Sequence, residues 1–255
     1  MSIKISALLI TYNEEDNILR FLDEASYAEE IIIVDSFSTD KTEELAIKNP
    51  KVHFVKREFD NFTNQRNYAL SLAKNDWVTF FDADEELSKD LINEILLTVK
   101  SKPKYEAYYV YRKFFFKDKC LSYSGMQSDK AVRLFNKSKI HYKLNHLVHE
   151  QIDCVNEMIG CLKNKLDHHT FNNEKDYLCK LNSYSRLRAK ELYDKKLKPN
   201  FFHFKIKPAY RFFNYYIIRL GFLDGKEGYV ISKLHAISVA NRYKYLDEIY
   251  KKNSD

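Results

Sequence analysis

The chain has 255 residues, 45% hydrophobic and 31% charged, which predicts a folded protein with one α/β domain and an appendage, or with two small domains. Only 5 residues are Gly, against 19 Tyr and 18 Phe, and neither Gly-x-Gly-x-x-Gly nor Gly-x-x-x-x-Gly-Lys-Ser/Thr occurs, which excludes glycine-rich nucleotide loops. The net charge of +6 is uneven, with 18 Lys+Arg against 8 Asp+Glu in residues 175–255 and 24 against 28 before them, so the C-terminal part is expected to face something anionic.

Strands and helices alternate along the first hundred residues. Apolar, β-prone runs predict buried strands, and amphipathic segments between them predict helices. The strands are expected at 3–10, 30–34, 52–55 and from 77, and the helices around 18–22, 43–47 and 61–73. This alternation predicts βαβ units with a parallel sheet, in which ligands bind beyond the carboxyl ends of the strands.

The fourth strand runs into residues 82–86, which hold four carboxylates within five positions. Buried negative charge needs a partner, and an Asp-x-Asp at a strand end suits Mg²⁺ or Mn²⁺. Alternatively, residues 84–86 form the first turn of a helix predicted over 87–99. The polar residues 11–14 and Asp35, at the ends of the first two strands, meet the same edge and favour a binding site.

The second half of the chain carries two histidine motifs after strands predicted at 105–116 and 131–135. Residues 147–150 place His149 and Glu150 side by side at the end of a short apolar run. His168 and His169 are adjacent, and since neighbouring side chains on a strand point apart, a surface or supporting role is expected for them.

From residue 174 the pattern becomes helical, and a break is expected from Pro199 to Pro208. The following segment, 210–220, is aromatic, flanked by basic residues and too short to span a bilayer. It predicts packing on the preceding α/β domain, insertion into the headgroup layer of an anionic membrane, or both. Nucleic-acid binding is a third interpretation, but no RNA or DNA module is recognised and no nucleic acid is expected.

The cysteines and the N-terminus indicate the compartment. The four cysteines include no Cys-x-x-Cys pair, and we expect no signal peptide before the segment Met1-Ser2-Ile3-Lys4. We expect reduced thiols in a cytoplasmic protein, peripheral to the inner face of the cytoplasmic membrane if the basic extension binds lipid.

Two sets of motifs resemble a known enzyme family. Residues 11–15, 34–42 and 81–84 resemble the N-terminal half of family 2 glycosyltransferases, which have the GT-A fold. A second set resembles the lipopolysaccharide-core β-glucosyltransferase group within that family: Phe62-x-x-Gln65-Arg66-Asn67-Tyr68-Ala69, Val132-Arg133-Leu134-Phe135, Leu147-Val148-His149-Glu150 and Arg219-Leu220-Gly221-Phe222-Leu223-Asp224-Gly225. Phe37 stands where that group often has glycine, which is expected to narrow the nucleotide pocket.

The resemblance implies a role for each residue that matches its motifs. The implied donor-site residues are Thr11, Asn13 and Glu14 at the base and ribose, Asp35 at a uracil-type imide N–H, Arg66 at the diphosphate, Asp82 with Ala83 at the ribose, and Asp84 at the metal. An acidic residue removes the proton of the acceptor hydroxyl, and Glu150 matches that position best, with Asp129 as the alternative. One base without a covalent intermediate implies inversion at the anomeric carbon.

The sequence thus predicts a GT-A type α/β fold with a central, mostly parallel sheet and a C-terminal helical extension. We expect a catalytic domain over 1–165, with a nucleotide-sugar half (1–100) and an acceptor half (101–165), and a basic, aromatic extension over 166–255. The expected activity is metal-dependent transfer of a hexose, with glucose favoured, from a UDP-sugar to a glycan or lipid-linked glycan such as lipopolysaccharide core. The alternatives are a nucleotidyltransferase and a non-enzymatic basic protein that binds membranes or nucleic acid.

Overall fold

The computed structural model describes residues 4–101, 103–117, 119–126, 129–142, 152–153, 158–171 and 173–253. The chain divides into two compact units. The first comprises Met1–Arg112 and Lys130–His168, and the second comprises Lys113–Asp129 and His169–Asp255. Within the described residues, no helix combines the length and the apolar character needed to cross a bilayer.

The first unit is built on a mixed sheet with the strand order β3-β2-β1-β4-β8-β6-β10-β5, and β9 pairs with β6 beside this path. The strands β1 to β4 are parallel to one another, whereas β8 runs antiparallel to both of its neighbours, β4 and β6. The bounds are β1 (Ile5–Thr11), β2 (Glu30–Asp35), β3 (Val52–Lys56), β4 (Trp77–Phe80), β5 (Glu85–Glu86), β6 (Ala107–Phe116), β8 (Lys130–Asn136), β9 (Ile159–Cys161) and β10 (Leu166–Phe171).

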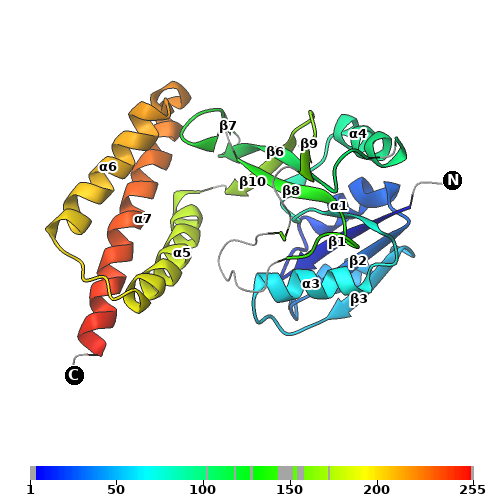
Figure 1. Ribbon diagram of the computed structural model, residues 1–255, viewed down its shortest axis with the longest axis horizontal. Coiled ribbons are helices and arrows are strands. Elements are labelled where there is room, and N and C mark those ends of the chain that lie inside the picture. The colour runs from blue at the N-terminus through cyan, green and yellow to red at the C-terminus, as the bar shows by residue number, and fades with distance from the viewer. Residues whose placement is uncertain are drawn as a thin grey trace. The chain divides into compact units, whose positions relative to one another are not determined.

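Helices cover both faces of this sheet, because side chains alternate between the faces along each strand. Ala7 and Leu9 of β1 pack in a core with α1 (Ile18–Glu24), α2 (Thr42–Ala46) and α4 (Lys89–Lys100). Leu8 points into a second core with α3 (Phe62–Leu72), which crosses in front of β1, β2 and β3 in Figure 1. The alternation makes both faces of the parallel strands apolar and leaves the strand ends for polar residues.

One alternative interpretation of the acidic run is wrong. The helix α4 does not begin with residues 84–86: it begins at Lys89, after Ser88 caps it by accepting a hydrogen bond from the Leu91 backbone N–H (3.2 Å). Glu85 and Glu86 instead form the short strand β5, antiparallel to β10. The acidic residues therefore lie in a turn and a strand before the helix.

The second unit is mainly helical, with α5 (Glu174–Asp194), α6 (Lys207–Phe213), α7 (Gly225–Lys252) and the hairpin strand β7 (Lys119–Leu121). The expected break is present around Pro199, where residues 195–200 are not helical, but it does not extend to Pro208. A π-helical turn (Phe202–Ile206) leads directly into α6, and a second one (Asn214–Ile218) follows it. In an α-helix the Pro208 ring would clash with the carbonyl four residues earlier, and the wider π-helical turn before it is a recognised way to accommodate such a site.

The motif 219–225 joins this helical path to the hairpin of the second unit. Asp224 is buried, and its carboxylate accepts the backbone N–H groups of Ser122 and Tyr123, both at 3.0 Å, and the Ser124 hydroxyl at 3.0 Å. A Cβ on Gly221 would lie 2.8 Å from the Ser124 Oγ, so only glycine fits there. Glycine and aspartate in this motif thus hold the turn at residues 122–124.

The predicted α/β fold class is confirmed: the chain has a mixed α/β fold with a curled central sheet and C-terminal helices. The predicted strands and helices of the first hundred residues are also present. The short strands β5 and β9 were not predicted, since two or three residues carry no detectable periodicity.

Candidate functional site

The ends of β1 and β2 are joined by a buried carboxylate. Asp35 is fully buried, and its Oδ1 accepts hydrogen bonds from the Thr11 Oγ1 (2.8 Å) and the Ser38 Oγ (2.5 Å). Its Oδ2 accepts the Ser38 backbone N–H at 2.8 Å. In the turn between Asp35 and Ser38, Phe37 has φ +59°, which is in the left-handed region, and the residue is 55% exposed. Glycine adopts this backbone conformation without steric cost, so glycine would suit position 37.

The loop after β1 is held against the turn after β2. The Asn13 Oδ1 accepts the Thr39 backbone N–H (2.8 Å), and the Asn13 backbone N–H donates to the Ser38 Oγ (2.8 Å). The Glu14 backbone N–H donates to the Thr42 Oγ1 (2.8 Å). Since parallel strands end at one edge of the sheet, these loops form a continuous polar rim there.

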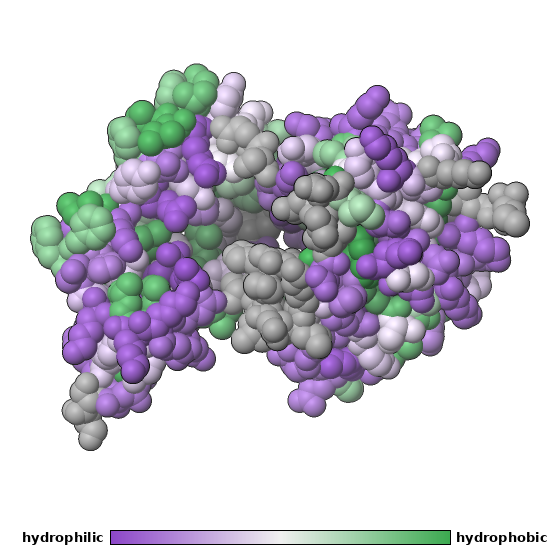
Figure 2. Space-filling model, viewed as in Figure 1, coloured by the Kyte–Doolittle hydropathy of each residue, from purple (hydrophilic) through white to green (hydrophobic). Residues whose placement is uncertain are grey.

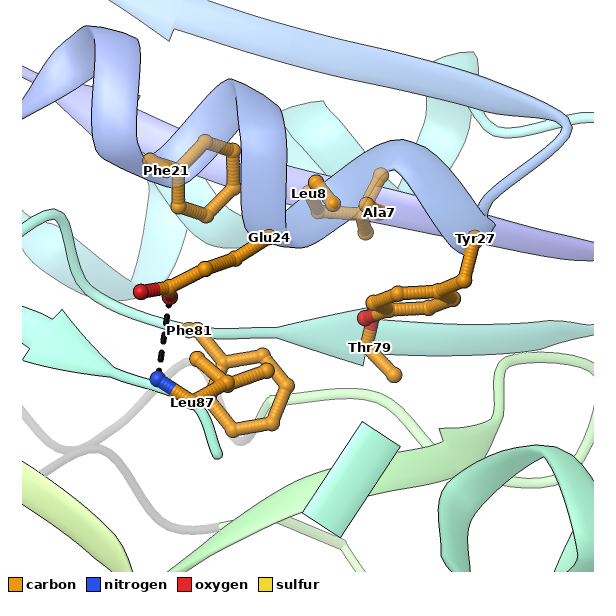
Figure 3. Close-up of a pocket in the computed structure, with 9 residues that line it drawn as sticks. Ala7, Leu8, Phe21, Glu24, Tyr27, Thr79, Phe81 and Leu87 are labelled. Atoms are coloured by element: carbon orange, nitrogen blue, oxygen red, sulfur yellow. Dashed lines mark hydrogen bonds between the residues drawn. The ribbon is translucent and has the colours of Figure 1, made fainter. Parts of the chain in front are cut away.

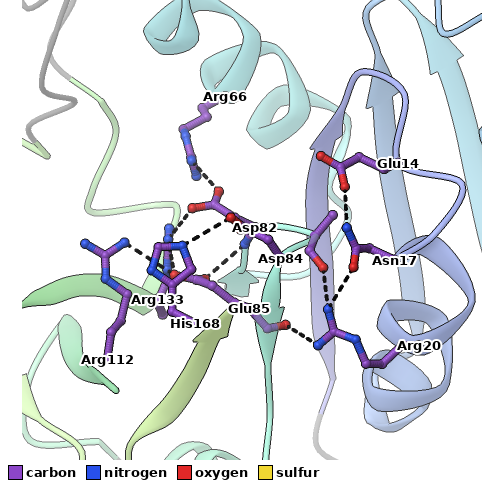
Figure 4. A network of polar contacts seen from close by, with 11 residues as sticks. Glu14, Asn17, Arg20, Arg66, Asp82, Asp84, Glu85, Arg112, Arg133 and His168 are labelled. Carbon is purple, nitrogen blue, oxygen red and sulfur yellow. Dashed lines mark hydrogen bonds and ion pairs between the residues drawn. The ribbon is translucent and has the colours of Figure 1, made fainter. Parts of the chain in front are cut away.

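Asp82, directly after β4, is held by two arginines. Its Oδ1 accepts from the Arg66 Nη2 (2.6 Å) and its Oδ2 accepts from the Arg133 Nη2 (2.5 Å) (Figure 4). Burial by itself raises the pKa of Asp82, but the positive charges of Arg133 and Arg66 outweigh it and hold that pKa far below its usual range. Asp82 is therefore ionised, and its position is fixed by α3 and β8.

Glu85 completes this buried cluster from β5. It is fully buried, its Oε1 accepts from Arg133 (2.6 Å) and Arg112 (3.5 Å), and its Oε2 accepts the Asp82 backbone N–H (3.0 Å). On the other side of the turn, Arg20 of α1 donates to the carbonyls of Ala83 (2.9 Å) and Glu85 (3.1 Å). Arginines from four parts of the chain thus contact residues 82–85, Arg20 through backbone carbonyls and the other three through the side chains of Asp82 and Glu85.

Asp84 contacts a histidine from another strand. Its Oδ2 lies 3.2 Å from the Nε2 of His168 on β10, where the Asp84 side chain is 30% exposed and the His168 side chain 10%. The pairing of β10 with β5 places His168 opposite Glu85, which brings it next to the acidic turn. His168 is therefore buried, which excludes the surface position but agrees with the supporting role that was the other expectation, while His169 stacks on Phe115 at 4.5 Å in the second unit.

The Asp84 and His168 pair fits a divalent cation. One carboxylate oxygen and one imidazole nitrogen are donors that Mn²⁺ accepts, and they leave further positions for diphosphate oxygens or water. Within the described ranges, no set of three or more His, Cys, Asp or Glu side chains is arranged around one point as a closed metal site. The donors present therefore suit an open site that is completed by a ligand.

Glu14 faces the same acidic turn from the β1 loop. Burial raises the pKa of the Glu14 carboxyl above its usual value, and the negative charges of Asp84 and Asp82 raise it further. A hydrogen bond from Asn17 opposes this shift. A cation beside Asp84 would lower the pKa of Glu14, because it would offset the charges that raise it.

A pocket elsewhere in this unit is distinct from the rim. It lies between α1 and the sheet and is lined by Ala7, Leu8, Phe21, Glu24, Ala25, Tyr27, Thr79, Phe81 and Leu87 (Figure 3). Its polar groups pair with each other or with backbone: Tyr27 bonds Thr79 (2.8 Å), and Glu24 accepts the Leu87 N–H (2.9 Å). The pocket is part of the packing of α1 and contains no predicted site residue.

The structure brings most of the predicted site residues into the first unit. These are Thr11, Asn13, Glu14, Asp35, Arg66, Asp82, Ala83 and Asp84. Asp129 belongs to the second unit, where its backbone N–H donates to the Met126 carbonyl (3.2 Å), and Glu150 lies outside the described residues.

Sequence reasoning missed four members of the site: Arg20, Arg112, Arg133 and His168. Arg133 stands in a motif that had been noticed, Val132–Phe135, but without a role. The other three carry no local signal, because their partners lie 27 to 84 positions away.

Comparisons with known proteins agree with this geometry. The sequence profile described as Glycosyl transferase family 2 matches residues 6–155. An uncharacterized glycosyltransferase of Rickettsia bellii is 30% identical over 96% of this chain and 87% of its own length. The lipopolysaccharide core biosynthesis glycosyltransferase LpsC of Rhizobium meliloti is 24% identical over 94% of this chain and 93% of its own.

Among solved structures, S. aureus TarS 1-349 in complex with UDP gives a TM-score of 0.49 and 14% identity, covering 98% of this chain and 92% of that chain. The matched profile spans more than half of the chain, including every predicted donor-site residue. The chain therefore belongs to glycosyl transferase family 2.

Proposed function

We propose that this enzyme is an inverting, metal-dependent hexosyltransferase that uses a UDP-sugar, with UDP-glucose favoured, and a glycan acceptor such as lipopolysaccharide core. The observation that carries the proposal is the set of partners of the two aspartates in the acidic turn. Asp82 is held by Arg66 and Arg133, and Asp84 contacts His168. In the proposal, the arginines keep Asp82 rigid, and Asp84 with His168 holds the cation.

The donor would bind along the rim of the parallel strands. In the proposal, Thr11, Asn13 and Glu14 line the base and ribose pocket, and Asp35 marks the uracil edge. Asp82 and Ala83 approach the ribose, since a carboxylate oxygen that accepts one arginine has a further lone pair for a hydroxyl. Arg66 faces the diphosphate, to which a guanidinium presents a planar fork of donors.

Asp84 and His168 would hold Mn²⁺ or Mg²⁺. The bound cation would neutralise charge that develops on the departing nucleoside diphosphate. His168 is an addition to the predicted set, and its support is its 3.2 Å contact with Asp84.

The acceptor hydroxyl would attack the anomeric carbon in line with the departing diphosphate. Glu150 would take the hydroxyl proton as general base, and Asp129 is the alternative. The carbon–oxygen bond to the acceptor forms as the bond to the diphosphate oxygen breaks. One such displacement inverts the anomeric centre.

The acceptor class rests on similarity to LpsC, whose name assigns it to lipopolysaccharide core biosynthesis. A core oligosaccharide is carried on lipid, so the proposal includes action at the cytoplasmic face of a membrane. Family membership leaves no support for a nucleotidyltransferase or a non-enzymatic binding protein.

Turnover of nucleotide sugars tests the proposal. Release of UDP would be measured with UDP-, GDP- and ADP-sugars, with Mn²⁺, with Mg²⁺ and with chelator. We expect Asp84→Ala to lower the rate by about 100-fold or more, as when a group that stabilises developing charge is lost. Glu86→Ala is the matched control, since its carboxylate is exposed and lies two positions away. Equal turnover by Asp84→Ala and the parent enzyme would refute the metal role.

A second comparison separates the two candidate bases. Glu150→Gln and Asp129→Asn would each be assayed for UDP binding and for transfer to acceptor. The general base is expected to be worth about 100- to 10,000-fold in transfer, with UDP binding retained. Full transfer by Glu150→Gln would remove the first assignment.

A further inference from the structure

A helical segment of the second unit, residues 201–223, presents an apolar face to solvent. Ten of its large hydrophobic residues are 40% to 72% exposed. They are Phe201, Phe202, Ile206, Tyr210, Phe213, Ile217, Ile218, Leu220, Phe222 and Leu223. Several recur every three or four residues, as one strip of a helix does. Figure 2 shows hydrophobic residues gathered over this part of the chain. We call this strip the aromatic face.

The opposite side of the segment packs on α7. Phe204 belongs to the core around α7, Lys207 donates to the Tyr243 hydroxyl (2.9 Å), and the His203 ring lies 4.9 Å from the Tyr243 ring. Lys205 and Arg219 are exposed beside the aromatic face. An exposed apolar strip of this size indicates an interaction surface.

The charge around the aromatic face selects its partner. Residues 195–223 contain seven Lys and Arg and no Asp or Glu: Lys195, Lys196, Lys198, Lys205, Lys207, Arg211 and Arg219. A second copy that paired through the same face would bring two sets of positive charge together, which opposes such a dimer. Aromatic and aliphatic side chains with basic flanks instead suit the interface of a bilayer that carries anionic lipid.

We infer that the aromatic face binds the surface of an anionic membrane, with its Phe, Tyr and Ile side chains in the headgroup layer and exposed basic side chains such as Lys205 and Arg219 on lipid phosphates. The inference rests on the proposed function for its setting, since a lipid-linked acceptor is found at such a surface. The inference goes beyond the proposed function by naming the residues that contact lipid, and it requires no membrane-spanning helix.

Vesicle flotation of the full chain tests the inference. The vesicles are phosphatidylcholine alone or phosphatidylcholine with phosphatidylglycerol, at low and high salt. The parent chain is expected to float with the anionic vesicles, and less at high salt because screening weakens the charge contacts. The double variant Phe213→Ser/Ile217→Ser is expected to bind at least about tenfold more weakly, from the apolar area withdrawn from the bilayer.

The control is Leu97→Ser, which removes a side chain of similar exposure (65%) from α4 in the first unit. It is expected to float like the parent chain, and circular dichroism checks that all variants are folded. No flotation of the parent chain, or equal flotation of the double variant, would overturn the inference. Dimerisation that the double variant abolishes, without flotation of the parent chain, would assign the face to a second copy instead.

Release of UDP from the donor without vesicles separates this inference from the proposed function. The double variant is expected to retain that activity, because neither residue belongs to the donor site. Activity without vesicle binding would overturn the membrane inference alone. Vesicle binding without turnover of any nucleotide sugar would overturn the proposed function alone.

Discussion

Removal of the Arg133 guanidinium tests whether the buried charge cluster holds the acidic turn. The group is 4% exposed and lies 2.5 Å from Asp82 and 2.6 Å from Glu85. Arg133→Met would leave Glu85, which is fully buried, with Arg112 at 3.5 Å, and would leave Asp82 with Arg66. Breaking a buried pair on one side costs about 3–5 kcal/mol, a large part of the roughly 5–15 kcal/mol that stabilises a domain.

Urea unfolding followed by tryptophan fluorescence measures this loss. Trp77 is the one tryptophan in the chain and lies on β4 of the first unit, so its signal reports on the unit that contains the cluster. Lys48→Met, at an exposed pair with Glu44 in the first unit, is the matched control and is expected to lose under about 1 kcal/mol. A loss under about 1 kcal/mol for Arg133→Met would refute the stabilising role.

Acid sensitivity gives the same variant a second readout. The depressed pKa of Asp82 contributes stability that is present above the unfolded pKa of about 3.9 and is lost as pH falls below it. Without Arg133 the pKa of Asp82 is expected to lie closer to its unfolded value, so the variant would lose less stability than the parent chain as pH falls below about 3.9. An equal loss in both chains would show that Arg66 alone sets the charge state of Asp82.

Other predictions concern single positions. Burial lowers the pKa of His235 to about 3, whereas the unfolded imidazole has a pKa of about 6.5 and protonates between pH 7 and pH 5. The free energy of unfolding is therefore expected to fall by about 2 kcal/mol over this range. Unfolding followed by circular dichroism would show a smaller fall for His235→Gln. Phe37→Gly is expected to raise the unfolding free energy by about 1 kcal/mol, because Phe37 has φ +59° and an exposed ring; an unchanged or lower value would contradict this. Gly228→Ala is expected to cost about 3 kcal/mol or more, since its Cβ would overlap the Gly221 carbonyl; an unchanged melting temperature would refute the close packing.

The pattern of apolar and polar residues predicted the features that depend on residues close together in the sequence. Apolar runs at 3–10 and 30–34 gave the buried strands, because only strands covered by helices on both faces are apolar without alternation. The polar residues that follow them had to reach one edge, because parallel strands end together. That reasoning located Thr11, Asp35 and Asp82 without coordinates.

Long-range pairing could not be predicted in the same way. His168 reaches Asp84 only because β10 pairs with β5, and a two-residue strand leaves no periodic signal. Arg20 reaches the Ala83 carbonyl from a helix that pattern analysis treated only for its apolar side. Pro208 was taken as a break, although a π-helical turn accommodates it. The base, whether Glu150 or Asp129, stays a prediction.

The charges of the acidic turn bear on how the proposed cation and donor would bind together. The eight charged side chains labelled in Figure 4, apart from His168, are four carboxylates and four arginines: Glu14, Asp82, Asp84, Glu85, Arg20, Arg66, Arg112 and Arg133. These eight charges cancel, and Asp35 at the same rim adds one more negative charge, so a nucleoside diphosphate bound at this edge would bring negative charge to a site with no positive charge in excess. A divalent cation at Asp84 would offset the added negative charge. Without the donor, the same cation would meet less negative charge at this edge and would bind more weakly. Because such coupling is reciprocal, cation and donor would each strengthen the binding of the other.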